Sequence, residues 1–220
     1  MDPGTAGALT DTGYPRRGSW LAPRLANRLL AFAGWRVEGA LPALPRFIIV
    51  VAPHTSNWDF PLGVLAMFAI DLRASWLGKH TIFFFPVAPL LRWIGGEPID
   101  RSAKHGTVGA AIEHFQTRPQ WVLALSPEGT RRRVDRWKTG FHRIAVGAGV
   151  PVVPVWIDYR AGVVGLGAPL TMGPDETSEV ARVHALFHKE MARYPECFAE
   201  ESLTSGAATG VRRDGHSSAY

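Results

Sequence analysis

A histidine and an aspartate lie close together in the segment His54-Thr55-Ser56-Asn57-Trp58-Asp59. A carboxylate within reach of an imidazole fixes its tautomer and stabilises its protonated form, so such a pair can act as a general base. The pair could take a proton from an alcohol as that alcohol attacks an electrophilic carbon. Two alternatives remain open, because Asp59 could only cap a helix together with Ser56, and His54 could be a solvated loop residue.

A second segment, Gly95-Gly96-Glu97-Pro98-Ile99-Asp100-Arg101, places an arginine at the end of a short predicted strand. Arginine suits phosphate, because its planar guanidinium donates two parallel hydrogen bonds. We therefore consider Arg101 a candidate phosphate ligand. The alternative is an ordinary surface ion pair with Asp100 or Glu97.

A third segment, Ser126-Pro127-Glu128-Gly129-Thr130-Arg131-Arg132-Arg133, begins a basic stretch that reaches Arg143 with a net charge of +4. Gly129 allows a tight turn beside a ligand, while Thr130 and Arg131 supply hydrogen-bond donors for phosphate. Lys138 precedes a predicted helix start, where the helix dipole also favours anions. The stretch could instead be an ordinary solvent-exposed charged surface. It contains no recognisable nucleic-acid-binding module, so we expect no nucleic acid as a partner.

Apolar runs alternate with helical patterns along the chain and predict the elements that position these segments. The alternation predicts an α/β fold, with a central, mostly parallel sheet and helices on both faces. In such sheets ligands bind beyond the carboxyl ends of the strands, where all three polar segments fall. The predicted strands are 47–52, 74–77, 97–100, 121–125, 152–157 and 163–172, and the predicted helices are 57–72, 86–94, 103–116, 140–149 and 178–194.

The start of the chain predicts an amphipathic helix over about 20–35, with Leu21, Leu25, Leu29 and Phe32 at helical spacing. Neighbouring arginines and the terminal Trp20 and Trp35 are typical of interfacial membrane helices, although the helix could equally cover the core. Composition predicts disordered tails over 1–18 and 203–220 around one domain, 19–202.

The composition is that of a globular protein, with 220 residues, 46% hydrophobic and 20% charged. Lysine and arginine number 24 against 19 acidic residues, which favours an anionic partner. The single cysteine cannot close an intrachain disulfide and indicates a reducing compartment. No apolar run reaches the length of a membrane-spanning helix, and residues 1–14 do not read as a signal peptide.

Together these motifs resemble the PlsC-type lysophospholipid and glycerol-phosphate acyltransferase family. The H-x4-D box matches His54 and Asp59, and the glycine-led box ending in arginine matches Gly95 through Arg101. The E-G-T-R box matches Glu128 through Arg131, and a proline-bearing strand matches 150–155. The resemblance covers about 47–157. It departs from the family pattern at Glu97-Pro98 and at Ser126.

The resemblance implies that His54, oriented by Asp59, activates a glycerol hydroxyl for attack on the thioester of acyl-CoA or acyl carrier protein. Arg101 and Arg131 would hold the acceptor's phosphate, Glu128 would shape the loop or touch a hydroxyl, and Lys138 would add positive field. No cofactor besides the thioester and no metal site is expected. The acceptor would be a lysophospholipid or another phosphorylated glycerol.

The acyl chain needs an apolar path, for which the first predicted helix (Phe60, Leu62, Leu65, Met67 and Phe68) and the run 83–85 are candidates, although both could be core. With the N-terminal helix they suggest a cytoplasmic enzyme bound peripherally to the anionic inner face of the cell membrane. Two rival functions remain: a thioesterase, in which the same base activates water, and a catalytically silent protein that binds anionic lipid.

Overall fold

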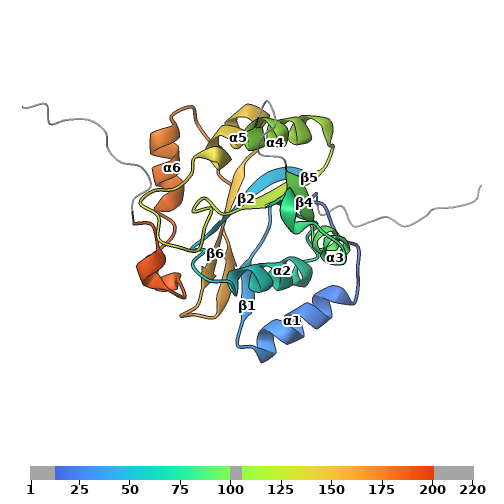
Figure 1. The fold of residues 1–220 in the computed structure, drawn as a ribbon. Helices are drawn as coiled ribbons and strands as arrows, with labels where there is room; N and C mark the ends of the chain where they lie inside the picture. Colours follow the sequence, from blue (N-terminus) through green and yellow to red (C-terminus); the bar gives the residue numbers. More distant parts are fainter. Residues whose placement is uncertain (1–12, 100–105, 201–220) are drawn as a thin grey trace, which may run out of the picture.

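A seven-stranded sheet forms the centre of the computed structural model, which describes residues 13–99 and 106–200 (Figure 1). The strand order is β1-β7-β6-β2-β5-β3-β4. Among the described strands only the β6–β7 pairing is antiparallel, so the predicted mostly parallel α/β fold is confirmed. The strands are β1 (Arg36–Gly39), β2 (Arg46–Ala52), β3 (Ser75–Lys79), β4 (Gly96–Ile99), β5 (Trp121–Leu125), β6 (Val152–Asp158) and β7 (Val163–Leu166).

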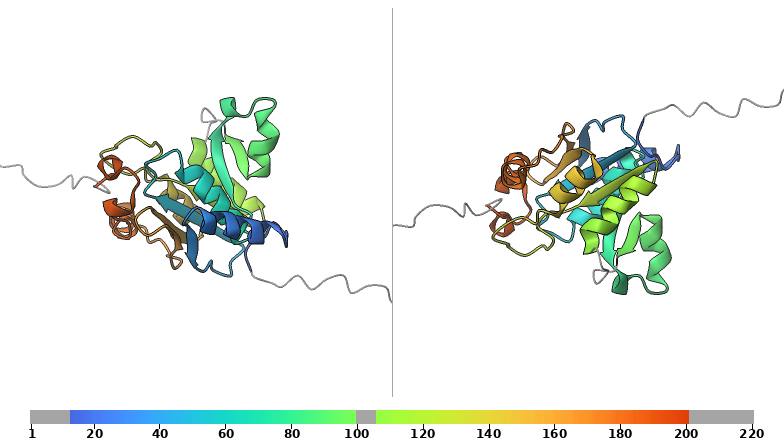
Figure 2. Two further views of the ribbon diagram at one scale, coloured as in Figure 1. Left: turned by 90° about the horizontal axis from the view of Figure 1, so that it is seen from below. Right: turned by 90° about the horizontal axis from the view of Figure 1, so that it is seen from above.

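Helices cover both faces of this sheet, with α1 and α2 on one side and α4 and α5 on the other (Figure 1). Figure 2 shows α3 and β4 at one end of the molecule and α6 at the opposite end. The helices are α1 (Ala22–Phe32), α2 (Asp59–Ala69), α3 (Val87–Trp93), α4 (Gly106–Thr117), α5 (Gly140–Ala148) and α6 (Glu176–His184), and short 3-10 turns occupy His80–Ile82, Lys189–Met191 and Pro195–Cys197.

The central strand β2 contributes buried side chains to the hydrophobic core on both faces of the sheet, which is why its sequence is continuously apolar. Ile48 and Val50 belong to the cluster under α4 and α5, while Phe47 and Ile49 belong to the cluster under α2. All four side chains are buried. This strand is therefore a rigid base for the loop that begins at Pro53.

Several predicted boundaries differ from the observed ones. Strand β1 was not predicted, because it is a four-residue edge strand with little buried side chain. The strand predicted over 163–172 stops at Leu166, and only Leu170 pairs again, with Val152. The helix predicted over 178–194 ends at His184, because Phe187 then turns inward and packs on Trp137.

Residues 13–18, expected as part of the N-terminal tail, lie against the turn between α2 and β3. The Tyr14 hydroxyl donates to the Ile70 carbonyl at 3.3 Å, and the Arg17 amide donates to the Asp71 carbonyl at 3.1 Å. The composition of residues 13–18 predicts a tail, but these contacts make them part of the folded domain, which therefore begins before residue 19. The remaining tail residues, 1–12 and 203–220, lie outside the described residues.

Candidate active site

Three neighbouring parallel strands, β6, β2 and β5, end at the same edge of the sheet. The loop after β2 carries His54, the loop after β5 carries Glu128, and Tyr159 directly follows β6. Parallel strands bring segments that are far apart in sequence to one edge, and here they place His54, Glu128 and Tyr159 at the carboxyl ends of neighbouring strands.

His54 and Asp59 are in contact. The imidazole Nδ1 lies 3.2 Å from Asp59 Oδ2, with the histidine side chain 19% exposed and the carboxylate 1% exposed. A carboxylate on Nδ1 directs the proton to that nitrogen, which leaves Nε2 as the free basic atom. The side chains thus have the geometry of an oriented general base.

Asp59, the first residue of α2, also holds the backbone that leads into this helix, so the structural role considered for it is observed beside its contact with His54. The Ser56 amide donates to Asp59 Oδ2 at 2.7 Å, and the Trp58 amide donates to the Ser56 hydroxyl at 3.2 Å. One carboxylate therefore fixes the start of the helix and the orientation of the imidazole.

Tyr159 is a site residue that the sequence did not indicate. Its hydroxyl donates to the other oxygen, Asp59 Oδ1, at 2.6 Å. Burial raises the pKa of Tyr159, and the bond to Asp59 raises it further, so the phenol stays a donor. A tyrosine 100 positions from its partner is outside the H-x4-D pattern, and only the pairing of β6 with β2 brings the two together.

Glu128 holds the loop that carries His54 in place. The His54 amide donates to Glu128 Oε2 at 3.0 Å, while Oε1 is buried and makes no hydrogen bond to the described residues. Burial raises the pKa of Glu128 to about 7; the His54 amide opposes the shift and nearby Asp59 reinforces it. Glu128 is expected to shape the loop or to touch a hydroxyl of the acceptor, and the structure shows it in contact with the backbone of His54.

Part of the basic stretch faces a cavity that His54 also lines. Gly129 has φ +65°, and an added Cβ would meet Lys138 Nζ at 2.5 Å, so glycine lets the ammonium approach the turn. Thr130, Arg131 and Lys138 line the cavity together with His54. Arg101, the remaining predicted phosphate ligand, lies outside the described residues.

The cavity has a volume of about 840 Å³ and a mostly apolar wall. It follows α2 from Asp59 and Phe60 to Met67, and continues to Leu72. Phe60 and Met67 line it as expected, whereas Leu62 packs against α1 and Phe68 lies elsewhere. Phe83 stacks on Trp76, and Phe84 and Phe85 are exposed. The run 83–85 therefore neither lines this cavity nor belongs to the buried hydrophobic core.

The described residues contain no cluster of three or more histidine, cysteine or acidic side chains that could hold a metal ion. Across residues 13–99 and 106–200, no helix has the length and apolar character needed to cross a bilayer.

Comparison with known proteins gives consistent matches. The sequence model of the acyltransferase family matches residues 36–158. The 1-acyl-sn-glycerol-3-phosphate acyltransferase of Salmonella typhimurium is 28% identical over 204 residues, which cover 81% of this chain and 82% of the relative. The Escherichia coli enzyme of the same name is 30% identical over 150 residues, 64% of this chain and 60% of the relative.

The fold also matches a solved structure. The 1-acyl-sn-glycerophosphate acyltransferase PlsC from Thermotoga maritima superposes with a TM-score of 0.55 at 21% identity, covering 76% of this chain and 75% of that one. At this identity the match supports the fold alone.

Proposed function

The chain belongs to the acyltransferase family and is an O-acyltransferase, and on that premise we propose that it moves a fatty acyl group from a thioester to a hydroxyl of a phosphorylated glycerol acceptor. The donor is acyl-CoA or acyl carrier protein, and the acceptor is a lysophospholipid, with 1-acyl-sn-glycerol-3-phosphate the first to test, given the names of the relatives. The thioester serves as the only co-substrate, without a further cofactor.

One observation carries this proposal: the His54–Asp59 pair opens onto an apolar cavity that Arg131 and Lys138 also line. An acyl chain needs an apolar wall, a phosphate needs cationic donors, and the transfer needs a base. The cavity offers all three within one connected space.

The chemistry follows from the orientation of the imidazole. His54 Nε2 accepts the proton of the acceptor hydroxyl as its oxygen bonds to the thioester carbonyl carbon. Asp59 holds Nδ1 and stabilises the imidazolium that forms. When the tetrahedral intermediate collapses, the C–S bond breaks and the imidazolium returns its proton to the leaving thiolate. An ester and a free thiol result, with no acyl-enzyme.

The acceptor's phosphate is assigned to Arg131, with Lys138 adding positive charge and Arg101 as a further ligand. Arg131 is exposed at the cavity rim, so it can present its guanidinium to an incoming phosphate. Glu128 shapes this site indirectly, because it holds the His54 backbone.

The enzyme is proposed to work at the anionic inner face of the cell membrane, on its cytoplasmic side. Helix α1 presents Leu25, Leu29 and Phe32 to solvent, Leu21 directly before it is also exposed, and Phe32 is 94% exposed. Its opposite side, with Ala26 and Leu30, is buried against the body. A helix that is anchored on one side and apolar on its free side suits the bilayer surface.

The test replaces His54 with alanine and follows a labelled acyl thioester in the presence of a lysophospholipid. Loss of the general base should lower turnover by at least about 100-fold. His188→Ala is the matched control, because this exposed histidine lies outside the cavity. Ester formation by the wild type supports the proposal, whereas free acid as the product would identify a thioesterase, and no turnover a silent lipid-binding protein.

The phosphate assignment has its own test. Arg131→Ala should raise the acceptor KM by about tenfold, because a charge-assisted contact is lost, and leave the donor KM nearly unchanged. Arg133→Ala removes an exposed arginine of the same stretch that does not line the cavity, and should change neither value. Equal losses for both substrates in Arg131→Ala would refute the assignment.

A further inference from the structure

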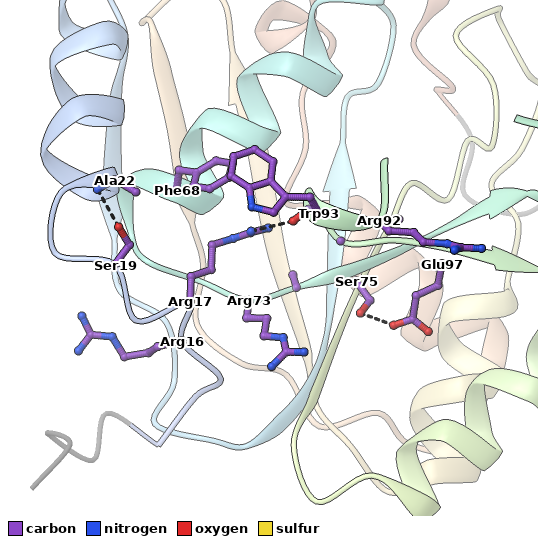
Figure 3. Close-up of a pocket in the computed structure, with 13 residues that line it drawn as sticks. Arg16, Arg17, Ser19, Ala22, Phe68, Arg73, Ser75, Arg92, Trp93 and Glu97 are labelled. Carbon is purple, nitrogen blue, oxygen red and sulfur yellow. Dashed lines mark hydrogen bonds between the residues drawn. The ribbon is translucent and has the colours of Figure 1, made fainter. Parts of the chain in front are cut away.

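A second pocket lies at the opposite end of the sheet from His54, where strands β3 and β4 begin (Figure 3). Its volume is about 530 Å³. The floor is formed by Ser75 and by Gly95 and Gly96, at the amino ends of these strands. The pocket is therefore separate from the cavity in which acyl transfer is proposed.

Four arginines line this pocket: Arg16, Arg17, Arg73 and Arg92. Arg16 pairs with the buried Asp71 at 2.8 Å. Arg73 and Arg92 are exposed and form no ion pair with a described residue. Figure 3 shows Arg16, Arg17 and Arg73 on one side of the pocket and Arg92 and Glu97 on the other.

Glu97, the acidic side chain in the wall, does not neutralise these arginines. Its Oε1 accepts from Arg118 at 2.9 Å and from Trp121 at 3.2 Å, and Ser75 donates to the same atom. Burial alone would raise the pKa of Glu97, but these hydrogen bonds outweigh burial and hold the pKa below its usual value. The carboxylate is ionised and engaged by Arg118, so the pocket keeps an excess of positive charge.

Arg17 is held in place by the fold. Its Nε donates to the Leu72 carbonyl at 3.1 Å and its Nη1 to the Trp93 carbonyl at 3.0 Å, while the Phe68 ring lies 4.3 Å from the guanidinium carbon. Its Nη2 has no protein acceptor in the described part of the chain. Burial and the like charge of Arg73 lower the pKa of Arg17, and Asp71 only partly compensates. An anion between Arg17 and Arg73 would relieve this repulsion.

The surroundings of the pocket indicate where such an anion would come from. Trp93, 62% exposed, forms part of its wall, and Leu90 is exposed on the same helix. Trp20 and Leu21, at the start of α1, are exposed next to the lining residues Ser19 and Ala22. Arginines bordered by exposed tryptophan and leucine match the boundary between lipid headgroups and acyl chains.

We propose that Arg17, Arg73 and Arg92 form a binding site for the phosphate of an anionic membrane lipid, distinct from the acceptor site. Arg17 supplies a fixed guanidinium, and the exposed Arg73 and Arg92 close on the phosphate from either side. The choice of a lipid over a soluble phosphate rests on the proposed membrane docking of α1, and not on acyl transfer.

The experiment measures binding of the full chain to phosphatidylcholine vesicles that contain either phosphatidylglycerol or oleate at equal negative charge. We expect tighter binding to the phosphatidylglycerol vesicles. The Arg73→Gln/Arg92→Gln variant should lose about tenfold in affinity for them, because charge-assisted contacts to phosphate are removed. Arg160→Gln, which removes an exposed arginine outside the pocket, should lose less than about twofold. Thermal melting checks that each variant is folded.

Three results would overturn the proposal. Equal affinity of the wild type for both kinds of vesicle would mean that charge alone matters. If Arg160→Gln loses as much vesicle affinity as the single variant Arg73→Gln, binding depends on the overall positive charge of the protein and not on this pocket. Binding of inorganic phosphate that depends on Arg73, without any effect of the variants on vesicle binding, would assign the pocket to a soluble phosphate.

Acyl transfer provides an independent readout. Arg73→Gln should turn over a detergent-dispersed acceptor like the wild type, whereas His54→Ala should bind vesicles normally and not turn over. Failure of the lipid site and failure of the proposed reaction are therefore distinguishable.

Discussion

At the scale of single residues, Asp59 connects structure and chemistry, because its two oxygens contact three groups. Oδ2 contacts the Ser56 amide and His54 Nδ1, and Oδ1 accepts from the Tyr159 hydroxyl. A carboxylate held at both oxygens cannot rotate away from the imidazole. We infer that Tyr159 is a positioning residue for the proposed base, since it acts through Asp59.

Tyr159→Phe removes that one hydrogen bond and keeps the ring, which packs edge-on against Trp35. We expect kcat to fall by about tenfold with little change in KM, because the base is less well oriented while the binding cavity is intact. Tyr194→Phe is the matched control, since Tyr194 is exposed and its hydroxyl has no hydrogen bond to the described residues.

A double-mutant cycle separates this role from a general effect on folding. In an Asp59→Asn background, Tyr159→Phe should cost less than about twofold, because the group through which it acts is already altered. A full tenfold loss in that background would show that Tyr159 does not act through Asp59.

Glu128 makes stability depend on pH. Its pKa is about 7 in the folded protein against 4.5 ordinarily, so the folded state binds the proton more tightly. The resulting stabilisation is complete below pH 4.5 and is lost as the pH rises through 7. The full effect is about 3 kcal/mol, because each tenfold difference in proton affinity between the folded and unfolded states contributes roughly 1.4 kcal/mol.

Glu128→Gln should remove this dependence, since an amide oxygen can still accept from the His54 amide and does not titrate. Urea unfolding at pH 5 and pH 8 measures this dependence. The unfolding free energy of the variant should increase relative to that of the wild type as the pH rises. A constant difference between the two proteins across this range would contradict the assignment.

At the scale of elements, the turn after β5 depends on Gly129. Gly129→Ala and Gly149→Ala should each cost about 1 kcal/mol in unfolding free energy, because both residues have φ +65°. Gly149 has no atom within 4 Å of an added Cβ, whereas Gly129 faces Lys138 Nζ. Only Gly129→Ala should therefore raise the acceptor KM, by several-fold, as it displaces the ammonium. Equal kinetics for both variants would show that the Lys138 position is unimportant.

The elements that could be predicted from the sequence are those with strong local signals. The buried runs of β2, β5 and β6 stand out because each is apolar on both faces. Strand β1 could not be found, since its four residues are held by pairing with β7 rather than by their own pattern. The end of α6 is set by the burial of Phe187, which is a tertiary effect.

The same division holds for the candidate site. Residues close together in sequence, such as His54 and Asp59, are recognisable by spacing, and the structure brings them into contact. Tyr159 and Arg17 depend on contacts across 100 and 55 positions, respectively, which no local motif encodes. Their partners are backbone or shared oxygens, so residue type alone does not reveal them.

At the scale of the whole molecule, the apolar cavity and the arginine pocket are separate spaces that come near one another at Leu72. The cavity starts at His54 and reaches Leu72, whose carbonyl accepts from Arg17 in the arginine pocket. Helix α1 packs on α2 along this path. The proposed reaction and the proposed lipid-phosphate site thus lie at opposite ends of one body.

The orientation at the membrane can be tested on α1 itself. Phe32→Ser removes an exposed ring, so it should change the unfolding free energy by less than about 0.5 kcal/mol. Vesicle affinity should fall by about tenfold, because burial of an aromatic side chain in lipid contributes roughly 1.5–3 kcal/mol. Val146→Ser, on α5 across the sheet, also removes an exposed apolar side chain and should leave vesicle binding unchanged. Loss of binding in both variants, or in neither, would mean that α1 does not face the bilayer, since docking through one surface must distinguish the two faces of the sheet.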